Sequence, residues 1–360
     1  MRHSNVTLRG KTIDDVLTSR SGRAAHAAAG ETTMTTTSGP GRGASRLTEN
    51  MRTLVCMGAV AGSWLTGACE SRQDLVRQAE ARAKAYGYRA ARVTRDVVYA
   101  QYGQRQLELD VYQPPASEHT RPVPAIVVVR GGAFRAGDKE FFGYIAGQLA
   151  MAGFVAVSIE YRTADEATFP AAVHDVKAAV RWVRAHAGTY GVVPERIGAI
   201  GGSAGAHLIA MLATTSGVKE FEGSGGHGHL SSDIQAAVAM GGAYDLQWKE
   251  GVGPRFIEAV TGFVGTPLAS DTGPFAAASP VTYVSSRSAP LLLLHSRTDP
   301  DVPFGQAVVL EERYRRAGAS VTLTPIEAPG VHGFWGNPRY FPDAKRRFVA
   351  FFRRILNAAR

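Results

Sequence analysis

Short apolar runs alternate with helical patterns from residue 125 to the end of the chain, and this alternation constrains the fold most. Runs typical of buried strands lie at 125–130, 154–161, 196–202, 234–242, 290–296 and 320–327. Helical patterns lie at 139–151, 171–187, from 204 onward, 304–317 and 342–358. Strands that alternate with helices form a parallel sheet with both faces covered, because each helix carries the chain back to the same edge. The pattern predicts an α/β fold with a mostly parallel central sheet.

Other elements are predicted around and within this core. Residues 74–87 have the spacing of an amphipathic helix, and 92–100 and 105–115 alternate apolar with polar residues around a turn. Such alternation predicts an antiparallel hairpin at the edge of the sheet. Residues 216–233 are rich in Gly and Ser and predict a surface loop, whereas 246–287 have weak periodicity and predict a small cap or lid. We therefore expect one domain over 71–360, with the lid at 246–287.

Charge and cysteine content exclude several classes of function. The formal net charge is +9, but the Arg residues are scattered and no dense basic run with interleaved aromatic residues occurs. We interpret the charge as a solvated surface and expect no nucleic-acid partner. The two cysteines, Cys56 and Cys69, lie in one short apolar segment. Residues 71–360 therefore hold no disulfide, no thiolate nucleophile and no cysteine metal site.

The first seventy residues resemble a targeting region rather than part of the domain. Residues 1–50 are rich in Ala, Thr, Gly and Ser, without an apolar period, and predict a disordered extension. Residues 51–70 have the layout of a signal peptide: Met and Arg, a short apolar run, then small residues. The end of this run also resembles a lipoprotein signal with a lipid anchor at Cys69, although Leu65 stands four places before the cysteine and such signals usually place it three before.

We hypothesise from this layout that Met51 is the true start and that the protein is exported. Residues 1–50 would then come from a misplaced upstream start. The alternative is a cytoplasmic protein with a weak N-terminal helix.

The stretch Gly201-Gly202-Ser203-Ala204-Gly205 places a serine between a predicted strand and a predicted helix. G-x-S-x-G in this context is the nucleophile-elbow motif, in which small neighbours allow a sharp turn that exposes the serine. The turn lies at the carboxyl edge of the sheet, where open α/β folds bind ligands. Ser203 is the predicted nucleophile; a glycine-rich turn with a bystander serine is the alternative.

A serine hydroxyl needs a base to take its proton, and the base needs an acid to orient it. In folds with this motif the chain order is serine, acid, histidine. Asp299 follows the predicted strand at 290–296, and His332 follows the last one. Each of the three residues lies just after a strand, which predicts a triad of Ser203, Asp299 and His332, with Asp301 as the fallback acid.

Other polar residues near these motifs have simpler interpretations. His207 lies one helical turn after the serine, where packing is the expected role. Asp175 lies on a predicted helix, where structural hydrogen bonding is expected. His227 and His229 resemble a metal pair, but no set of carboxylate ligands accompanies them, so we expect no metal site.

Acyl transfer by a serine nucleophile also needs donors for the oxyanion. The backbone N–H of Ala204, directly after the nucleophile, is one predicted donor. Gly132 and Ala133 are the others, since they lie in a glycine-bearing loop that follows the strand at 125–130.

Residues 93–357 resemble the esterase and lipase branch of the α/β-hydrolase fold, with a feruloyl- or acetyl-esterase-like pattern. The matching motifs are YRTADEATFP, RIGAIGGSAGAHL, HSRTDPDVP and PGVHGF. The resemblance implies that Ser203, Asp299 and His332 form the triad and that the loop at 130–134 supplies oxyanion donors. The chain departs from the family at Arg130, where the loop usually begins with His, and at Thr163 and Asp165, where one branch has YRLAPE.

These observations predict a serine carboxylesterase that acts on small-molecule esters and needs no cofactor. A kynurenine-formamidase-like amidase is the alternative within enzymes. A non-catalytic binding protein with the same fold, its site weakened by Arg130, is the alternative outside them.

Overall fold

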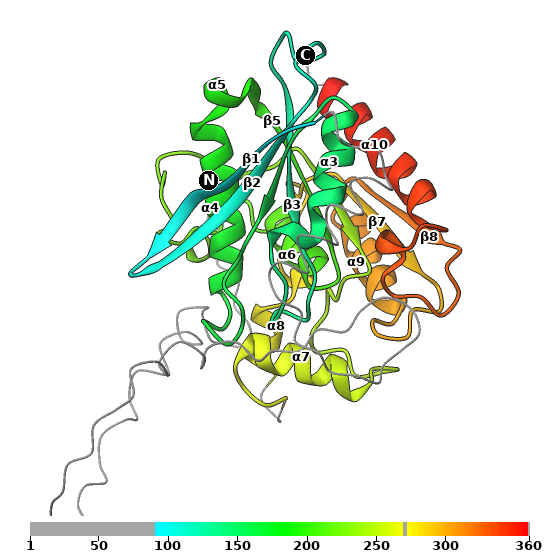
Figure 1. Ribbon diagram of the computed structural model, residues 1–360. Helices are drawn as coiled ribbons and strands as arrows, with labels where there is room; N and C mark the ends of the chain where they lie inside the picture. Colours follow the sequence, from blue (N-terminus) through cyan, green and yellow to red (C-terminus); the bar gives the residue numbers. More distant parts are fainter. Residues whose placement is uncertain (1–90, 269–271, 359–360) are drawn as a thin grey trace, which may run out of the picture. The chain divides into compact units, whose positions relative to one another are not determined.

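The computed structural model describes residues 91–268 and 272–358, and an eight-stranded sheet runs through this part of the chain (Figure 1). The strand order is β1-β2-β4-β3-β5-β6-β7-β8. The strands are β1 (Arg92–Tyr102), β2 (Arg105–Gln113), β3 (Val123–Val129), β4 (Val155–Ile159), β5 (Val192–Gly202), β6 (Ala236–Met240), β7 (Leu291–Ser296) and β8 (Val321–Ile326). β1 and β2 pair antiparallel, as do β2 and β4, and all other pairs are parallel. The predicted α/β fold and edge hairpin are confirmed.

The α-helices are α3 (Gly143–Met151), α4 (Ala171–Ala185), α5 (Ala187–Tyr190), α6 (Ala204–Thr214), α7 (Pro254–Val264), α8 (Gly273–Ala277), α9 (Gly305–Arg316) and α10 (Phe341–Ala358). The helices predicted at 139–151, 171–187, from 204, 304–317 and 342–358 lie close to their predicted positions, whereas α7 and α8 lie in the region predicted as a cap. The 3-10 turns are η1 (Lys139–Phe142), η2 (Lys219–Phe221), η3 (Pro280–Thr282) and η4 (Phe334–Gly336). Among the described residues no helix is long and apolar enough to cross a bilayer.

Some boundaries differ from the prediction for local reasons. The helix predicted at 139–151 is split into η1 and α3, because the Asp138 carboxylate accepts a hydrogen bond from the Glu140 N–H and begins a separate turn. The predicted helix at 171–187 ends at Ala185, and the short α5 follows. The helix predicted at 74–87 and the targeting region at 1–70 lie outside the described residues.

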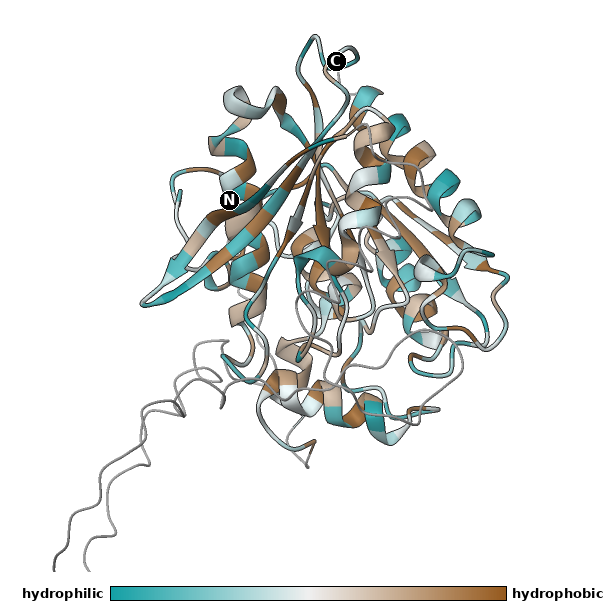
Figure 2. Ribbon diagram, viewed as in Figure 1, coloured by the Kyte–Doolittle hydropathy of each residue, from teal (hydrophilic) through white to brown (hydrophobic). Residues whose placement is uncertain are grey.

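Helices cover both faces of the sheet, and the parts of the central strands that lie between them, such as β3 and residues 197–202 of β5, are apolar and buried. One side packs β-strand residues such as Ile126, Val128 and Val238 against α3 and α10. On the other side, α4 and α6 contact β5 and β3, and α9 contacts β8. Figure 2 shows apolar colour along the central strands and hydrophilic colour at the tip of the β1–β2 hairpin. This explains why the central strands have no polar alternation, whereas the edge hairpin does.

The region predicted as a lid, 246–287, holds α7, α8 and η3. The Phe263 ring of α7 stacks on Phe134, from the loop after β3, with ring centroids 4.0 Å apart. The Phe263 carbonyl also accepts a hydrogen bond from the Phe169 N–H, in the segment that follows β4. α7 therefore packs on loops at the carboxyl ends of β3 and β4, and its role as a lid stays a prediction.

Candidate active site

Ser203 forms the turn between β5 and α6. Its φ of 54° and ψ of −122° lie in a region that L-residues rarely adopt, and such a conformation costs roughly 1–3 kcal/mol. The turn is held by a hydrogen bond from the Ser203 N–H to the Met240 carbonyl (2.8 Å) and by one from the His207 N–H to the Ser203 carbonyl (3.1 Å). The sharp turn leaves the serine side chain at the carboxyl end of the sheet.

The glycines around Ser203 are required by close backbone contacts. A Cβ atom at Gly201 would lie 2.4 Å from the Gly205 carbonyl oxygen. A Cβ atom at Gly205 would lie 2.2 Å from the Val129 carbonyl oxygen. No side chain fits at either position, because backbone atoms cannot move aside as a flexible side chain can. The glycines thus allow α6 to pack directly on the ends of β3 and β5.

Ser203, His332 and Asp299 form one chain of hydrogen bonds. The Ser203 Oγ lies 2.8 Å from His332 Nε2, and His332 Nδ1 lies 2.7 Å from Asp299 Oδ2. The Asp299 side chain is fully buried, whereas the His332 side chain is 16% exposed. The other Asp299 oxygen, Oδ1, accepts hydrogen bonds from the N–H groups of Asp301 and Val302, both at 2.9 Å. The carboxylate is therefore fixed in place and can orient the imidazole that faces the serine.

The other candidate residues have structural contacts. Asp301 is exposed and contributes only its backbone N–H to Asp299. Asp175 is buried and forms an ion pair with Arg162 at 2.7 Å. The rings of His227 and His229 have centroids 6.4 Å apart. Of the residues in the described ranges, no three His, Cys, Asp or Glu side chains gather closely enough to hold a metal ion.

His207 is buried within an aromatic cluster, one helical turn after Ser203. Its Nδ1 lies 2.7 Å from the Ala243 carbonyl oxygen, and its ring contacts Phe134 and Phe263 edge-on. Burial lowers the pKa of His207 to about 4. The side chain is therefore neutral at pH 7 and packs as expected.

The predicted oxyanion loop leaves β3 and passes directly beside Ser203. A Cβ atom at Gly131 would lie only 3.1 Å from the Ser203 Cβ. Three successive residues then have positive φ: Gly132 at 116°, Ala133 at 52° and Phe134 at 63°. The N–H groups of Gly132 and Ala133 find no acceptor among the described residues. They are thus free to bind a ligand oxygen.

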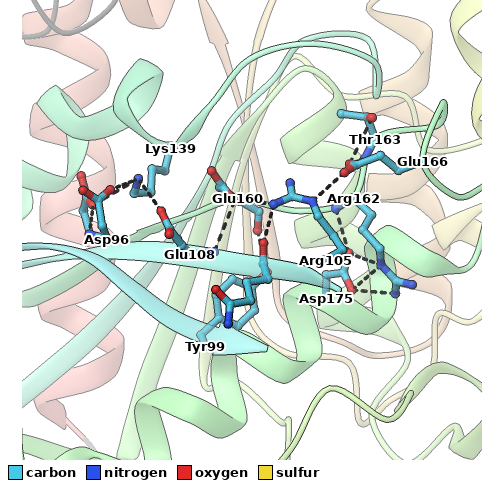
Figure 3. Close-up of polar contacts among 12 residues, drawn as sticks. Asp96, Tyr99, Arg105, Glu108, Lys139, Glu160, Arg162, Thr163, Glu166 and Asp175 are labelled. Atoms are coloured by element: carbon cyan, nitrogen blue, oxygen red, sulfur yellow. Dashed lines mark hydrogen bonds and ion pairs between the residues drawn. The ribbon is translucent and has the colours of Figure 1, made fainter. Parts of the chain in front are cut away.

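An ionic network anchors the segments that flank this loop to the β1–β2 hairpin (Figure 3). The buried Lys139 lies 2.6 Å from Asp96 Oδ1, and Arg105 lies 2.6 Å from Glu166 Oε1. Thr163 donates its N–H to the same Glu166 at 2.8 Å. The segment around Thr163 also holds the loop, since the Ala164 N–H donates to the Phe134 carbonyl at 2.8 Å.

Two residues beside the predicted triad were not found from the sequence. His295 is buried at the end of β7, where its Nε2 lies 2.9 Å from the Val302 carbonyl oxygen and 3.5 Å from Asp299 Oδ2. Burial lowers its pKa. The Trp335 ring meets His332 edge-on, with ring centroids 5.2 Å apart. Two sequence features could have identified these residues: a histidine within an apolar strand, and a tryptophan three places after His332.

Residues 109–314, more than half of the chain, match the family model named BD-FAE. The chain belongs to the BD-FAE family. Esterase LipQ of Mycobacterium tuberculosis is 34% identical over 248 residues, which cover 68% of this chain and 58% of LipQ. The probable carboxylic ester hydrolase LipM of the same organism is 34% identical over 59% of this chain and 49% of LipM. This BD-FAE chain therefore spans about half the length of the curated relatives it matches.

Solved structures of esterases share the fold of this BD-FAE protein. A truncated carbohydrate esterase from gut microbiota aligns with a TM-score of 0.64 and 28% identity over 72% of this chain and 96% of that one. The butyrate-bound thermophilic esterase Est2 of Thermogutta terrifontis aligns with a TM-score of 0.62 and 27% identity over 74% of this chain and 95% of that one.

Proposed function

We propose that this protein is a serine carboxylesterase whose nucleophile, base and acid are Ser203, His332 and Asp299. The observation that carries the proposal is the pair of hydrogen bonds, 2.8 Å and 2.7 Å long, that links the three side chains. The esterase names of LipQ and of the structural neighbours support the same reaction class.

In this reaction, Ser203 Oγ attacks the carbonyl carbon of the ester, and its proton passes to His332 Nε2. The π electron pair of the carbonyl moves to its oxygen. Collapse of this tetrahedral intermediate expels the alcohol, which takes the proton from His332. Water then attacks the acyl-enzyme by the same steps, releases the carboxylic acid and restores Ser203. The buried Asp299 carboxylate stabilises the imidazolium that forms twice in the cycle.

The developing oxyanion is stabilised by backbone groups on two sides. The N–H of Ala204 begins α6, where the helix dipole favours negative charge. We assign the N–H groups of Gly132 and Ala133 as the other donors. One such donor typically contributes roughly a hundred- to a thousandfold in rate, so the geometry of the loop at 131–134 is central to the reaction.

The experiment that tests the proposal is hydrolysis of p-nitrophenyl acetate, butyrate and octanoate by the full chain and by its Ser203→Ala variant. We expect turnover by the unsubstituted protein and its loss in the variant, with thermal unfolding showing that both are folded. Faster hydrolysis of N-formylkynurenine than of any ester would instead support the amidase. A folded protein that hydrolyses none of these compounds would support the non-catalytic binding protein.

We further propose that the protein is exported, on the pattern of residues 51–70, with a lipid anchor at Cys69 as the form to test first. Mass spectrometry of the mature N-terminus from membrane and soluble fractions checks this. Removal of the residues before the mature domain is the expected result, with acyl groups on Cys69 if the protein is anchored and an unlipidated N-terminus if it is freely secreted. A chain intact from Met1 would contradict export.

A further inference from the structure

Arg130 is a buried cation at the start of the oxyanion loop. It follows β3 directly, and only 2% of its surface is exposed. No carboxylate in the described part of the chain pairs with it. A guanidinium is always charged at physiological pH, and a buried charge without a counter-ion is unfavourable unless dipoles compensate it.

The dipoles that surround Arg130 belong mainly to the loop itself. Its Nη1 donates to the Gly131 carbonyl at 3.1 Å and to the Ala136 carbonyl. The Tyr161 hydroxyl oxygen lies 3.1 Å from the same nitrogen and shares that nitrogen's two hydrogens with the two carbonyls, and the guanidinium lies over the Tyr161 ring, 4.2 Å from its centroid. Arg130 therefore links Gly131, at the start of the loop, to Ala136, near its end.

The bond to the Gly131 carbonyl fixes the direction of the next N–H. In a trans peptide the C=O of one residue and the N–H of the next point in opposite directions. Because the Gly131 carbonyl points toward Arg130, the Gly132 N–H points away from it. Gly131 lies against Ser203, with a Cβ position only 3.1 Å from the Ser203 Cβ. Gly131 thus lies next to Ser203, and its carbonyl faces Arg130.

We propose that Arg130 is a positioning residue for the oxyanion site, acting through the peptide between Gly131 and Gly132. The positive charge of the Arg130 guanidinium, beside the Gly131 carbonyl, polarises that peptide. The polarisation strengthens the Gly132 N–H as a donor to the oxyanion. Its second bond, to Ala136, holds the loop in the positive-φ conformation of Ala133 and Phe134. This inference rests on the proposed esterase function and names how the site is preorganised.

The test uses Arg130→Met, Arg130→Lys and Arg130→Gln in the full chain, with p-nitrophenyl butyrate as substrate. We expect Arg130→Met to lower kcat by roughly ten- to a hundredfold with KM changed less than about threefold, as for loss of a transition-state interaction. Arg130→Lys keeps the charge and should retain more activity than Arg130→Gln. Lys177→Met is the matched control, since it removes another buried cation and should lower stability but leave kcat unchanged.

A second measurement distinguishes weaker stabilisation of the oxyanion from general damage to the fold. An alkyl trifluoromethyl ketone binds when Ser203 Oγ adds to its carbonyl carbon, the π pair moves to oxygen and the proton passes to His332. Its inhibition constant should rise across the Arg130 variants in proportion to the loss of kcat/KM.

Three results would overturn the inference. A folded Arg130→Met variant with kcat within twofold of the unsubstituted protein would do so, as would an unchanged inhibition constant beside a reduced kcat. If Arg130→Met does not fold, equal kcat values for the folded Lys and Gln variants would overturn it. An unsubstituted protein without serine-dependent turnover would instead contradict the proposed function, and the inference with it.

Discussion

His207 should make the protein sensitive to acid, and the size of the effect follows from its burial. The side chain is fully buried, and because a carbonyl can only accept, Nδ1 must carry the proton that is donated to Ala243. Burial lowers the pKa of His207 to about 4, below the value of 6.5 for an unperturbed histidine. The unfolded chain therefore binds a proton between pH 6.5 and pH 4 that the folded chain does not, so the free energy of unfolding falls as the pH falls.

The magnitude is large enough to measure. Because the pKa of His207 falls from 6.5 to about 4 on folding, protonation of the unfolded chain should lower the free energy of unfolding by roughly 2–3 kcal/mol between pH 7.5 and pH 4.5. The His207→Asn variant keeps a donor at the Nδ1 position but does not titrate. Urea unfolding of both proteins from pH 7.5 to 4.5 measures how their free energies of unfolding differ with pH. The contributions of titratable groups common to both proteins cancel in this difference. Parallel stability curves for the two proteins would refute the reasoning.

Two further predictions concern packing and buried charge. Gly205→Ala should prevent folding or lower the free energy of unfolding by about 3 kcal/mol or more, because its Cβ would meet the Val129 carbonyl. Gly188→Ala is the control, with no atom within 4 Å of the new Cβ, and equal stability of the two variants in urea would contradict the argument. Lys139→Met should lower the free energy of unfolding by about 3 kcal/mol, since it removes a cation from the fully buried Asp110. An unchanged urea midpoint would show that the Arg95 contact suffices for Asp110.

The sheet and the positions of the predicted triad were accessible from the sequence because they depend on local patterns. The buried strand β3 is a continuous apolar run and β7 begins with four successive leucines, so polar residues that follow such runs stand out. The carboxyl ends of parallel strands share one edge, so Ser203, Asp299 and His332 could be expected near each other without coordinates.

The remaining features depend on contacts between distant segments. The sequence identified Arg130 as a departure from the family but gave no partner for it, because Ala136 and Tyr161 meet it only in the folded loop. The positive φ of Ala133 and Phe134 is likewise imposed by tertiary contacts and has no residue signal, since neither is Gly or Asn. His295 is hidden in an apolar strand.

Covalent labelling with paraoxon tests the central claim most directly. In this reaction Ser203 Oγ bonds to phosphorus, p-nitrophenolate leaves and His332 accepts the serine proton. The account predicts a single diethylphosphoryl group per chain, found by mass spectrometry on the peptide that carries Ser203, and none in the folded Ser203→Ala variant. A folded protein that takes no label, or takes it on a different residue, would contradict the assignment of Ser203 as the nucleophile.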